Sequence, residues 1–244
     1  DLFPRKTLIK RKVAGNKMDF QLIASNIDVG FIFQSCDFDF NIRRLERYLV
    51  MIHEAGIESI ILLSKSDLVT QEELGQRLLD IKTNFTSIPV IVFSNTDGSG
   101  LKDIRQNLES GKTYCLLGSS GVGKTTLALQ ISSLYAYKLA KPTLFFCMEM
   151  SFDQLVRLFV SHSLDRPWSQ FRREDALLFS MQFEDVPIYF GYAPRIKPLQ
   201  IQQTFLEARD RFGIEFFVFD NLHTLIREHD HVTERIGAAS KMFK

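Results

Sequence analysis

Short apolar runs rich in β-branched and aromatic residues recur along the chain, and each is followed by a stretch with a helical pattern. The runs cover residues 27–35, 58–64, 88–94, 112–118, 142–149, 186–192 and 214–220. Several of them are apolar at consecutive rather than alternate positions, which indicates strands that are buried on both faces. Such strands alternating with helices are typical of a mainly parallel sheet covered by helices. We therefore predict a doubly wound α/β fold with about seven strands in one sheet.

The helical stretches carry recognisable start signals. Asn41 and Thr70 stand where N-cap residues are expected, and residues 70–73 (TQEE) and 151–154 (SFDQ) have the spacing of capping boxes. The pattern predicts a helix over residues 41–55 that packs one face on the sheet. That face consists of Ile42, Leu45, Leu49 and Ile52.

Composition narrows the class of protein. The 244 residues are 45% hydrophobic and 24% charged, with a formal net charge of +1, as in ordinary globular proteins. No segment approaches the ~18 uncharged positions of a membrane span, so no membrane partner is expected. Three widely spaced cysteines argue against a zinc knuckle and against a disulfide framework. A reducing, cytoplasmic compartment is the resulting prediction.

The two ends of the sequence differ from its middle. Residues 1–17 hold six Lys and Arg residues against one Asp, which suits either a solvated terminus or a nucleic-acid contact. We favour the solvated terminus because no aromatic residues are interleaved as in RNA-binding motifs. No signal peptide begins at Asp1, and the pattern near Lys244 is helical without a cap. We therefore expect a piece of a longer protein, with residues 1–20 as the remnant of a preceding domain.

The strongest motif is GSSGVGKT at residues 118–125, which satisfies GxxxxGK[ST] between a predicted strand and a predicted helix. Its glycines let backbone N–H groups curve around the β-phosphate, and the helix N-terminus adds a positive dipole end. Lys124 is expected to reach the β and γ phosphates, and Thr125 to hold Mg²⁺. The chain is thus predicted to be a P-loop NTPase. Its expected phosphate-binding residues are Gly118, Ser119, Ser120, Gly121, Val122, Gly123, Lys124, Thr125 and Thr126.

A second polar cluster follows the strand predicted over residues 58–64. The carboxylate of Asp67 can accept hydrogen bonds from two N–H groups that guanine presents and adenine lacks, while the stem of Lys65 lies over the purine ring. After another strand, the turn at Ser94 and Asn95 could offer a backbone N–H to the guanine oxygen. Taken alone, a solvated loop with a helix-capping aspartate explains the pattern equally well.

The order of these motifs favours guanine recognition, because the base-reading residues precede the phosphate loop, the reverse of ordinary GTPases. The segments LFPRKTLIKRK, LIASNIDVGFIF, DFDFNIRRLERYLV and LLSKSDL, followed by GSSGVGKT, resemble the circularly permuted ribosome-assembly GTPases of the RsgA family. The resemblance covers residues 1–127 and implies GTP hydrolysis coupled to the small ribosomal subunit or its RNA, with Lys65 and Asp67 on guanine. Ser64 stands where that family usually has Asn or Thr. The family's switch segment, DxxG motif and zinc domain have no counterpart here.

From the phosphate loop on, a different resemblance holds. The segments KTTLALQISSLYA, PTLFFCMEMSFDQLVRLF, DVPIYFGY and IEFFVFDNLHTLI look like the RecA-type ATPase core of the DnaB and Twinkle replicative helicases. This resemblance implies ATP as nucleotide, DNA as partner, Glu149 as the residue that polarises the attacking water, and Asp220 as support for Mg²⁺ through water. His223 stands where those helicases commonly have Gln. We expect residues 229–231 (HDH) to be solvated rather than to bind a metal.

The two resemblances share one phosphate loop, so the chain looks like a hybrid of a permuted GTPase half, residues 21–127, and a truncated helicase half, residues 118–244. A gene fusion, an engineered splice and a mis-assembled reading frame each explain such a hybrid. Three functions stay open: a GTP-dependent ribosome-assembly module, favoured by the base-reading residues; a DNA-helicase ATPase core, favoured by Glu149 and Asp220; and a non-catalytic nucleotide-binding scaffold. Neither pattern predicts an oligomeric state.

Overall fold

The structure is a computed structural model with two compact units, which divide between Lys124 and Thr125. The residues that it describes are 6–12, 20–164, 166, 168–172, 174–175, 179, 181, 183–193, 196 and 198–220. Each unit contains its own parallel sheet. No helix among these residues is both long and apolar enough to cross a membrane.

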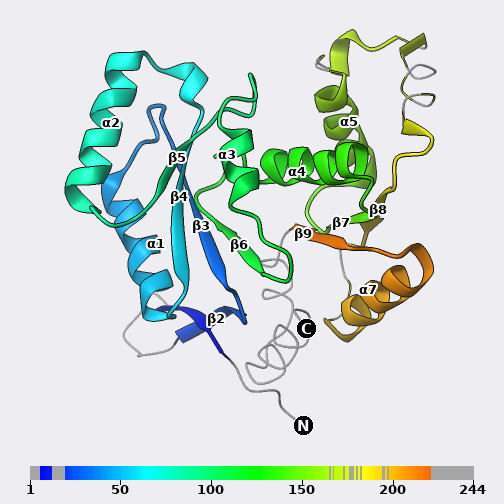
Figure 1. Cartoon of the computed structure of the whole chain (residues 1–244), viewed down its shortest axis with the longest axis horizontal. Coiled ribbons are helices and arrows are strands. Elements are labelled where there is room, and N and C mark those ends of the chain that lie inside the picture. The colour runs from blue at the N-terminus through cyan, green and yellow to red at the C-terminus, as the bar shows by residue number, and fades with distance from the viewer. Residues whose placement is uncertain are drawn as a thin grey trace. The chain divides into compact units, whose positions relative to one another are not determined.

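The first unit is built on a four-stranded parallel sheet with the order β5-β4-β3-β6, and a two-stranded antiparallel pair, β1-β2, precedes it. Figure 1 shows α1 running beside β3 and β4, on which it packs. The strands are β1 (Leu8–Lys12), β2 (Phe20–Ser25), β3 (Val29–Ser35), β4 (Glu58–Ser64), β5 (Val90–Val92) and β6 (Tyr114–Leu117). The helices are α1 (Ile42–Glu54), the short 3₁₀ turn η1 (Ser66–Leu68), α2 (Gln71–Asn84) and α3 (Leu101–Gln106).

Strand β3 forms the centre of this sheet. All of its residues are buried, as predicted for a strand flanked on both sides and covered on both faces. Helix α1 begins where predicted, because the Asn41 side chain accepts a hydrogen bond from the backbone N–H of Arg44 at 2.9 Å. Three of the four expected apolar residues of its inner face are buried, namely Leu45, Leu49 and Ile52. The predicted capping box at Thr70 is also present.

The second unit holds a three-stranded parallel sheet with the order β8-β7-β9. Its elements are α4 (Lys124–Leu139), β7 (Thr143–Cys147), α5 (Phe152–Ser163), η2 (Trp168–Gln170), β8 (Ile188–Tyr192), α7 (Pro198–Phe212) and β9 (Phe216–Asp220). The predicted capping box of Ser151 and Gln154 begins α5. The rings of Phe179, Phe183 and Phe190 meet Phe159 edge-on, with centroids 5.1–5.9 Å apart, so the core of this unit uses part of the chain's large phenylalanine content.

The predicted class, a mainly parallel α/β fold, is confirmed, but the prediction of one sheet was wrong. The parallel strands divide into a four-stranded and a three-stranded sheet. The apolar pattern identifies buried strands, whereas strand order depends on which backbones exchange hydrogen bonds. Among the described residues, β6 pairs with β3 alone, and β7 pairs with β8 and β9. The four residues of β6 are only half-buried, in keeping with a place at the end of its sheet.

Candidate functional site

The loops that follow the four parallel strands of the first unit meet at one edge of its sheet, because parallel strands end on the same side. Two hydrogen bonds link three of them. The backbone N–H of Ser66, after β4, donates to the carbonyl oxygen of Phe93, after β5, at 3.3 Å. The side-chain amide of Asn95 donates to the carbonyl oxygen of Gly123 in the phosphate loop at 3.1 Å. The predicted base-reading turn, the second turn and the phosphate loop are therefore joined.

The phosphate loop has the predicted context: β6 ends at Leu117, residues 118–123 form the loop, and α4 begins at Lys124. Two of its glycines are in tight contact. A Cβ on Gly118 would lie 2.8 Å from the Cβ of Phe33, and a Cβ on Gly123 would lie 2.4 Å from the amide nitrogen of Asn95. The ammonium of Lys124 donates to the carbonyl oxygens of Gly118 at 3.0 Å and Ser119 at 2.6 Å, so it lies across the loop.

The predicted base-reading residues lie directly after β4. Lys65 has the left-handed backbone conformation, φ 61° and ψ 39°, which is rare for a residue with a side chain and is concentrated at functional sites. Its ammonium forms an ion pair with Asp37, with Nζ 2.8 Å from Oδ2. Asp67 lies in η1 with an exposed side chain, as a ligand contact requires. The Ser64 hydroxyl is buried and has no hydrogen-bond partner within the described part of the chain.

The turn after β5 differs in detail from the expectation. The backbone N–H of Ser94 donates to the carbonyl oxygen of Ser99 at 3.0 Å, so it is already engaged within the turn. The Ser94 hydroxyl accepts hydrogen bonds from the N–H groups of Thr96 and Asp97. Ser94 thus shapes the turn, and the side chain of Asn95 links that turn to the phosphate loop. Gly100 allows the close return of the chain, because a Cβ there would lie 2.0 Å from the carbonyl oxygen of Val92.

Two carboxylates to which the sequence pattern gave no role lie in the loop after β3. Asp37 is only 8% exposed and accepts hydrogen bonds from the Ser35 hydroxyl at 2.8 Å and the backbone N–H of Asp39 at 3.0 Å, besides its ion pair with Lys65. Burial alone would raise the pKa of Asp37, but Lys65, the Asp39 N–H and the Ser35 hydroxyl together lower it below 3.8. Asp39 accepts a hydrogen bond from the Ser119 hydroxyl at 3.1 Å and forms an ion pair with Arg44. The only signal in the sequence was the acid-rich CDFDF directly after a buried strand.

In the second unit, the two residues predicted to hold magnesium lie together. The Thr125 hydroxyl donates to the carboxylate of Asp220 at 2.9 Å, and Asp220 is the last residue of β9. Glu149 follows β7 and is exposed. Asp220 is the register partner of Cys147, the last residue of β7, so it lies at the same end of that sheet. Burial raises the pKa of the Cys147 thiol, the backbone N–H groups of Met150 and Glu149 lower it, and the charges of Asp220 and Glu149 raise it.

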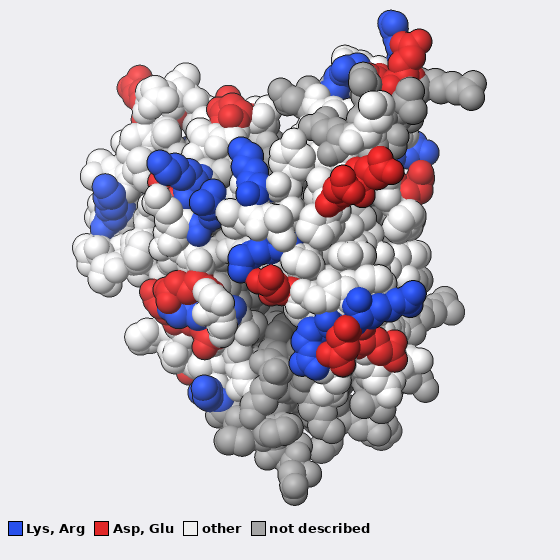
Figure 2. Space-filling view, turned by 45° about the vertical axis from the view of Figure 1, so that its right-hand side comes forward, with Lys and Arg blue, Asp and Glu red and all other residues white. Residues whose placement is uncertain are grey.

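A hydroxyl and a carboxylate oxygen suit Mg²⁺, which binds oxygen ligands and usually takes one or two from the protein, with water and phosphate completing its shell. Thr125 and Asp220 fit that description. Within the described ranges there is no group of three or more His, Cys, Asp or Glu side chains that could hold a metal by themselves. His223 and residues 229–231 lie outside those ranges. On the face in Figure 2, basic and acidic side chains both occur.

Comparisons with known proteins match the two halves of the chain to different families. The model of the RsgA GTPase family matches residues 2–141, and that of the DnaB-like helicase C-terminal domain matches residues 95–244. Both matches include the phosphate loop.

The curated relatives each match about half of the chain. The small ribosomal subunit biogenesis GTPase RsgA of Syntrophotalea carbinolica is 36% identical over 133 residues, which are 52% of this chain and 36% of the relative. RsgA 2 of Lactiplantibacillus plantarum is 41% identical over 124 residues, 51% of this chain and 34% of the relative. The chain therefore spans about a third of the length of these relatives. Among solved structures, YjeQ from Thermotoga maritima matches with a TM-score of 0.44 and 22% identity, over 54% of this chain and 44% of that one.

Proposed function

The chain belongs to the RsgA GTPase family through residues 2–141 and to the DnaB-like helicase C-terminal domain family through residues 95–244, and we propose that it binds and slowly hydrolyses GTP. One observation supports guanine above all. The turn that carries Lys65 and Asp67 is hydrogen-bonded to the neighbouring turn, and that turn is hydrogen-bonded to the phosphate loop through Asn95. Residues suited to a base and residues suited to phosphates thus belong to one connected edge of the sheet.

Each part of this edge has a distinct task in the proposed complex. The exposed carboxylate of Asp67 accepts hydrogen bonds from the two guanine N–H groups, and the stem of Lys65 covers the purine ring. Backbone N–H groups of residues 118–123 and the start of α4 surround the phosphates. Lys124 exchanges its contacts with two loop carbonyls for the β and γ phosphate oxygens.

The chemical step needs support from a metal and an ordered water. Mg²⁺, when bound, would neutralise charge on the transferred phosphoryl group. Thr125 and Asp220 would hold it, Asp220 through water, and Glu149 would orient the attacking water. We expect turnover far below one per second, because the sequence presents no arginine finger, a group that alone contributes about 10³ to 10⁵ in rate.

The test is a direct titration of the purified chain with fluorescent GTP and ATP in the presence of Mg²⁺. We expect tighter binding of GTP, and we expect Lys124→Ala to abolish binding, because each charge-assisted hydrogen bond of the ammonium contributes roughly 1.5–3 kcal/mol. Unchanged GTP affinity in Lys124→Ala contradicts the assignment of the phosphate loop. Glu54→Gln, which changes an exposed carboxylate, controls for the handling of a variant protein.

For a partner, we propose the small ribosomal subunit, on the basis of the names of the curated relatives, with action in the cytoplasm. Sedimentation of the chain with purified small subunits should depend on GTP or a non-hydrolysable analogue. Co-sedimentation that is equal with GTP, with ATP and without nucleotide contradicts this assignment.

A second candidate function is an ATPase core of the DnaB type, with DNA as the partner. It is favoured by the Thr125–Asp220 hydrogen bond and by the match over residues 95–244. This function predicts that ATP binds more tightly than GTP and that single-stranded DNA accelerates its turnover. Tight nucleotide binding without turnover of either triphosphate supports instead a non-catalytic scaffold.

A further inference from the structure

The loop between β3 and α1, residues 36–41, lies between two strand tips that carry predicted nucleotide contacts. Strand β3 pairs with β4 on one side and with β6 on the other, so its following loop neighbours both the base-reading turn and the phosphate loop. The two carboxylates of this loop serve different neighbours. Asp37 forms an ion pair with Lys65 after β4, and Asp39 accepts a hydrogen bond from Ser119 after β6.

Lys65 is a residue that needs an external anchor. Its side chain is 33% exposed, and a lysine stem has many rotamers when its ammonium is not held. Its backbone conformation, φ 61°, is disfavoured for any residue with a Cβ. The preceding Ser64 hydroxyl makes no hydrogen bond within the described residues, so it does not tether this turn.

Asp37 has the properties of such an anchor. Its carboxylate is 8% exposed, so its own position is restricted, and its lowered pKa keeps it charged at neutral pH. One oxygen is held by the Ser35 hydroxyl and the Asp39 N–H, and the other accepts the Lys65 ammonium at 2.8 Å. With the ammonium fixed at Asp37, the methylene stem is the part of Lys65 that is available to cover a ring.

We propose that Asp37 is a positioning residue for guanine recognition, which anchors the Lys65 ammonium so that the Lys65 stem is pre-arranged over the purine ring. This inference rests on the proposed GTP function. In this role Asp37 acts through Lys65, so its contribution concerns the base and is the same for GTP and GDP. Asp39 acts on the phosphate loop through Ser119 instead.

The experiment is a double-mutant cycle read by titration of the full chain with fluorescent GTP, GDP and ATP. We expect Asp37→Asn to lower the affinities for GTP and GDP by the same factor. That factor is about tenfold, which corresponds to the loss of one charge-assisted hydrogen bond. In a Lys65→Met background, Asp37→Asn should change either affinity by less than about twofold, because the residue through which it acts is absent.

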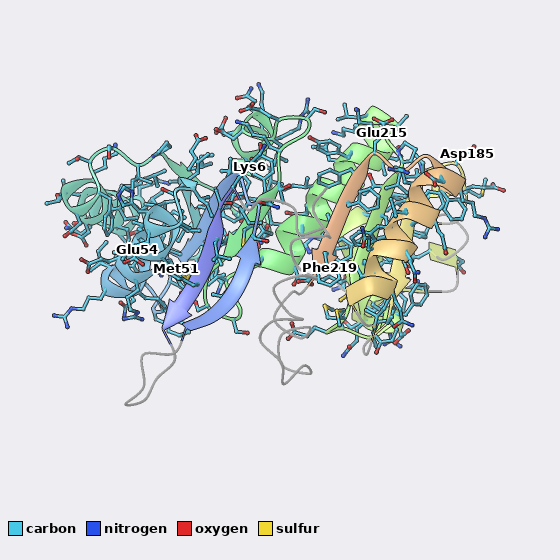
Figure 3. The ribbon with its side chains drawn as sticks, turned by 90° about the horizontal axis from the view of Figure 1, so that it is seen from below. Lys6, Met51, Glu54, Asp185, Glu215 and Phe219 are labelled. Atoms are coloured by element: carbon cyan, nitrogen blue, oxygen red, sulfur yellow. The ribbon has the colours of Figure 1, made fainter. Side chains whose placement is uncertain are left out.

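The control for a lost carboxylate is Glu54→Gln. Glu54 is exposed at the far end of α1, as labelled in Figure 3, and the thirteen-residue helix places it about 18 Å along the axis from the loop. If Asp37→Asn does not fold, Ser35→Ala replaces it. Ser35→Ala removes one hydrogen bond from Asp37 and keeps the charges of Asp37 and Lys65. It should lower the affinities for GTP and GDP equally, by about two- to threefold. This loss should occur only when Lys65 is present.

The outcomes separate this inference from the function on which it rests. A wild-type chain that binds GTP no better than ATP overturns both. A wild-type chain selective for GTP, together with an Asp37→Asn loss that is equally large with and without Lys65, overturns the positioning role alone. A loss of affinity for GTP without a loss for GDP also overturns the positioning role, because such a difference arises from the γ-phosphate and not from the base.

Discussion

Replacement of Gly123 by alanine tests the link between the phosphate loop and the turn after β5. Gly123 has φ +91°, and a Cβ there would lie 2.4 Å from the side-chain nitrogen of Asn95. The backbone conformation alone costs an L-residue about 1–2 kcal/mol. The Asn95 amide must also move, and its 3.1 Å hydrogen bond to the Gly123 carbonyl, worth about 0.5–1.5 kcal/mol, is lost. Together these two contributions amount to about 1.5–3.5 kcal/mol.

A second glycine of the same loop provides the matched control. Gly121 also has a positive φ, +78°, but a Cβ there meets nothing within 4 Å. Gly121→Ala should therefore cost only the free energy of placing an L-residue in this backbone conformation, about 1–2 kcal/mol. The difference between the two variants, about 1 kcal/mol or roughly fivefold in an equilibrium constant, isolates the conflict with Asn95.

Two quantities are measured, namely the free energy of unfolding in urea, followed by circular dichroism, and the affinity for GTP. Strain that is retained in the folded loop lowers the free energy of unfolding. Strain that is relieved by a rearrangement of the loop weakens phosphate binding instead. We expect Gly123→Ala to be worse than Gly121→Ala in at least one of them. In an Asn95→Ala background the two variants should become equivalent. If the two variants are already equivalent with Asn95 present, the Asn95–Gly123 hydrogen bond contributes neither to stability nor to GTP affinity, contrary to this prediction.

Two further predictions concern catalysis and pH. Glu149→Gln should reduce a slow turnover, measured by phosphate release in single-turnover conditions, at least about a hundredfold without changing nucleotide affinity; an unchanged rate removes Glu149 from the mechanism. The folded-state pKa of Asp37 is lowered from 3.8, so its charged form stabilises the folded state above that pH, and the contribution is lost as the pH falls through the lower folded-state pKa. The difference in unfolding free energy between wild type and Asp37→Asn should accordingly be constant above about pH 5 and shrink below pH 4; a constant difference down to pH 3 contradicts the assigned ion pair.

The local elements were predictable because short-range rules determine them. The caps at Asn41, Thr70 and Ser151 depend on residues three positions apart, and the structure confirms all three. The phosphate loop is a contiguous motif whose strand–loop–helix context lies within residues 114–139, and this context is confirmed as well.

The arrangement of the strands was less predictable. Consecutive apolar residues in β3 and β7 indicate burial, which the structure shows, but they do not encode the neighbouring strand. Pairing depends on backbone hydrogen bonds between segments far apart in the chain. The pattern therefore led us to expect one sheet, whereas the described parallel strands form two.

The contacts around the candidate site were the least predictable part. Asp37 and Lys65 are 28 residues apart, and Asp39 and Ser119 are 80 apart, so no local pattern announces either pair. The backbone conformation of Lys65 is equally invisible in the sequence, because residues with φ above zero other than glycine are set by their surroundings. The hydrogen bond that engages the Ser94 N–H within its own turn likewise becomes evident only from the structure.

Guanine recognition is tested most directly by the affinity of wild type and Asp67→Asn for GTP, ATP and xanthosine triphosphate. In Asp67→Asn, an amide N–H group faces a guanine N–H group in place of one acceptor, which should weaken GTP binding by several kcal/mol. Xanthine presents an oxygen where guanine has its amino group, so the variant should prefer xanthosine triphosphate, with ATP binding nearly unchanged. Equal GTP affinity in the two proteins, or a wild type that binds ATP more tightly than GTP, would contradict guanine recognition by this chain.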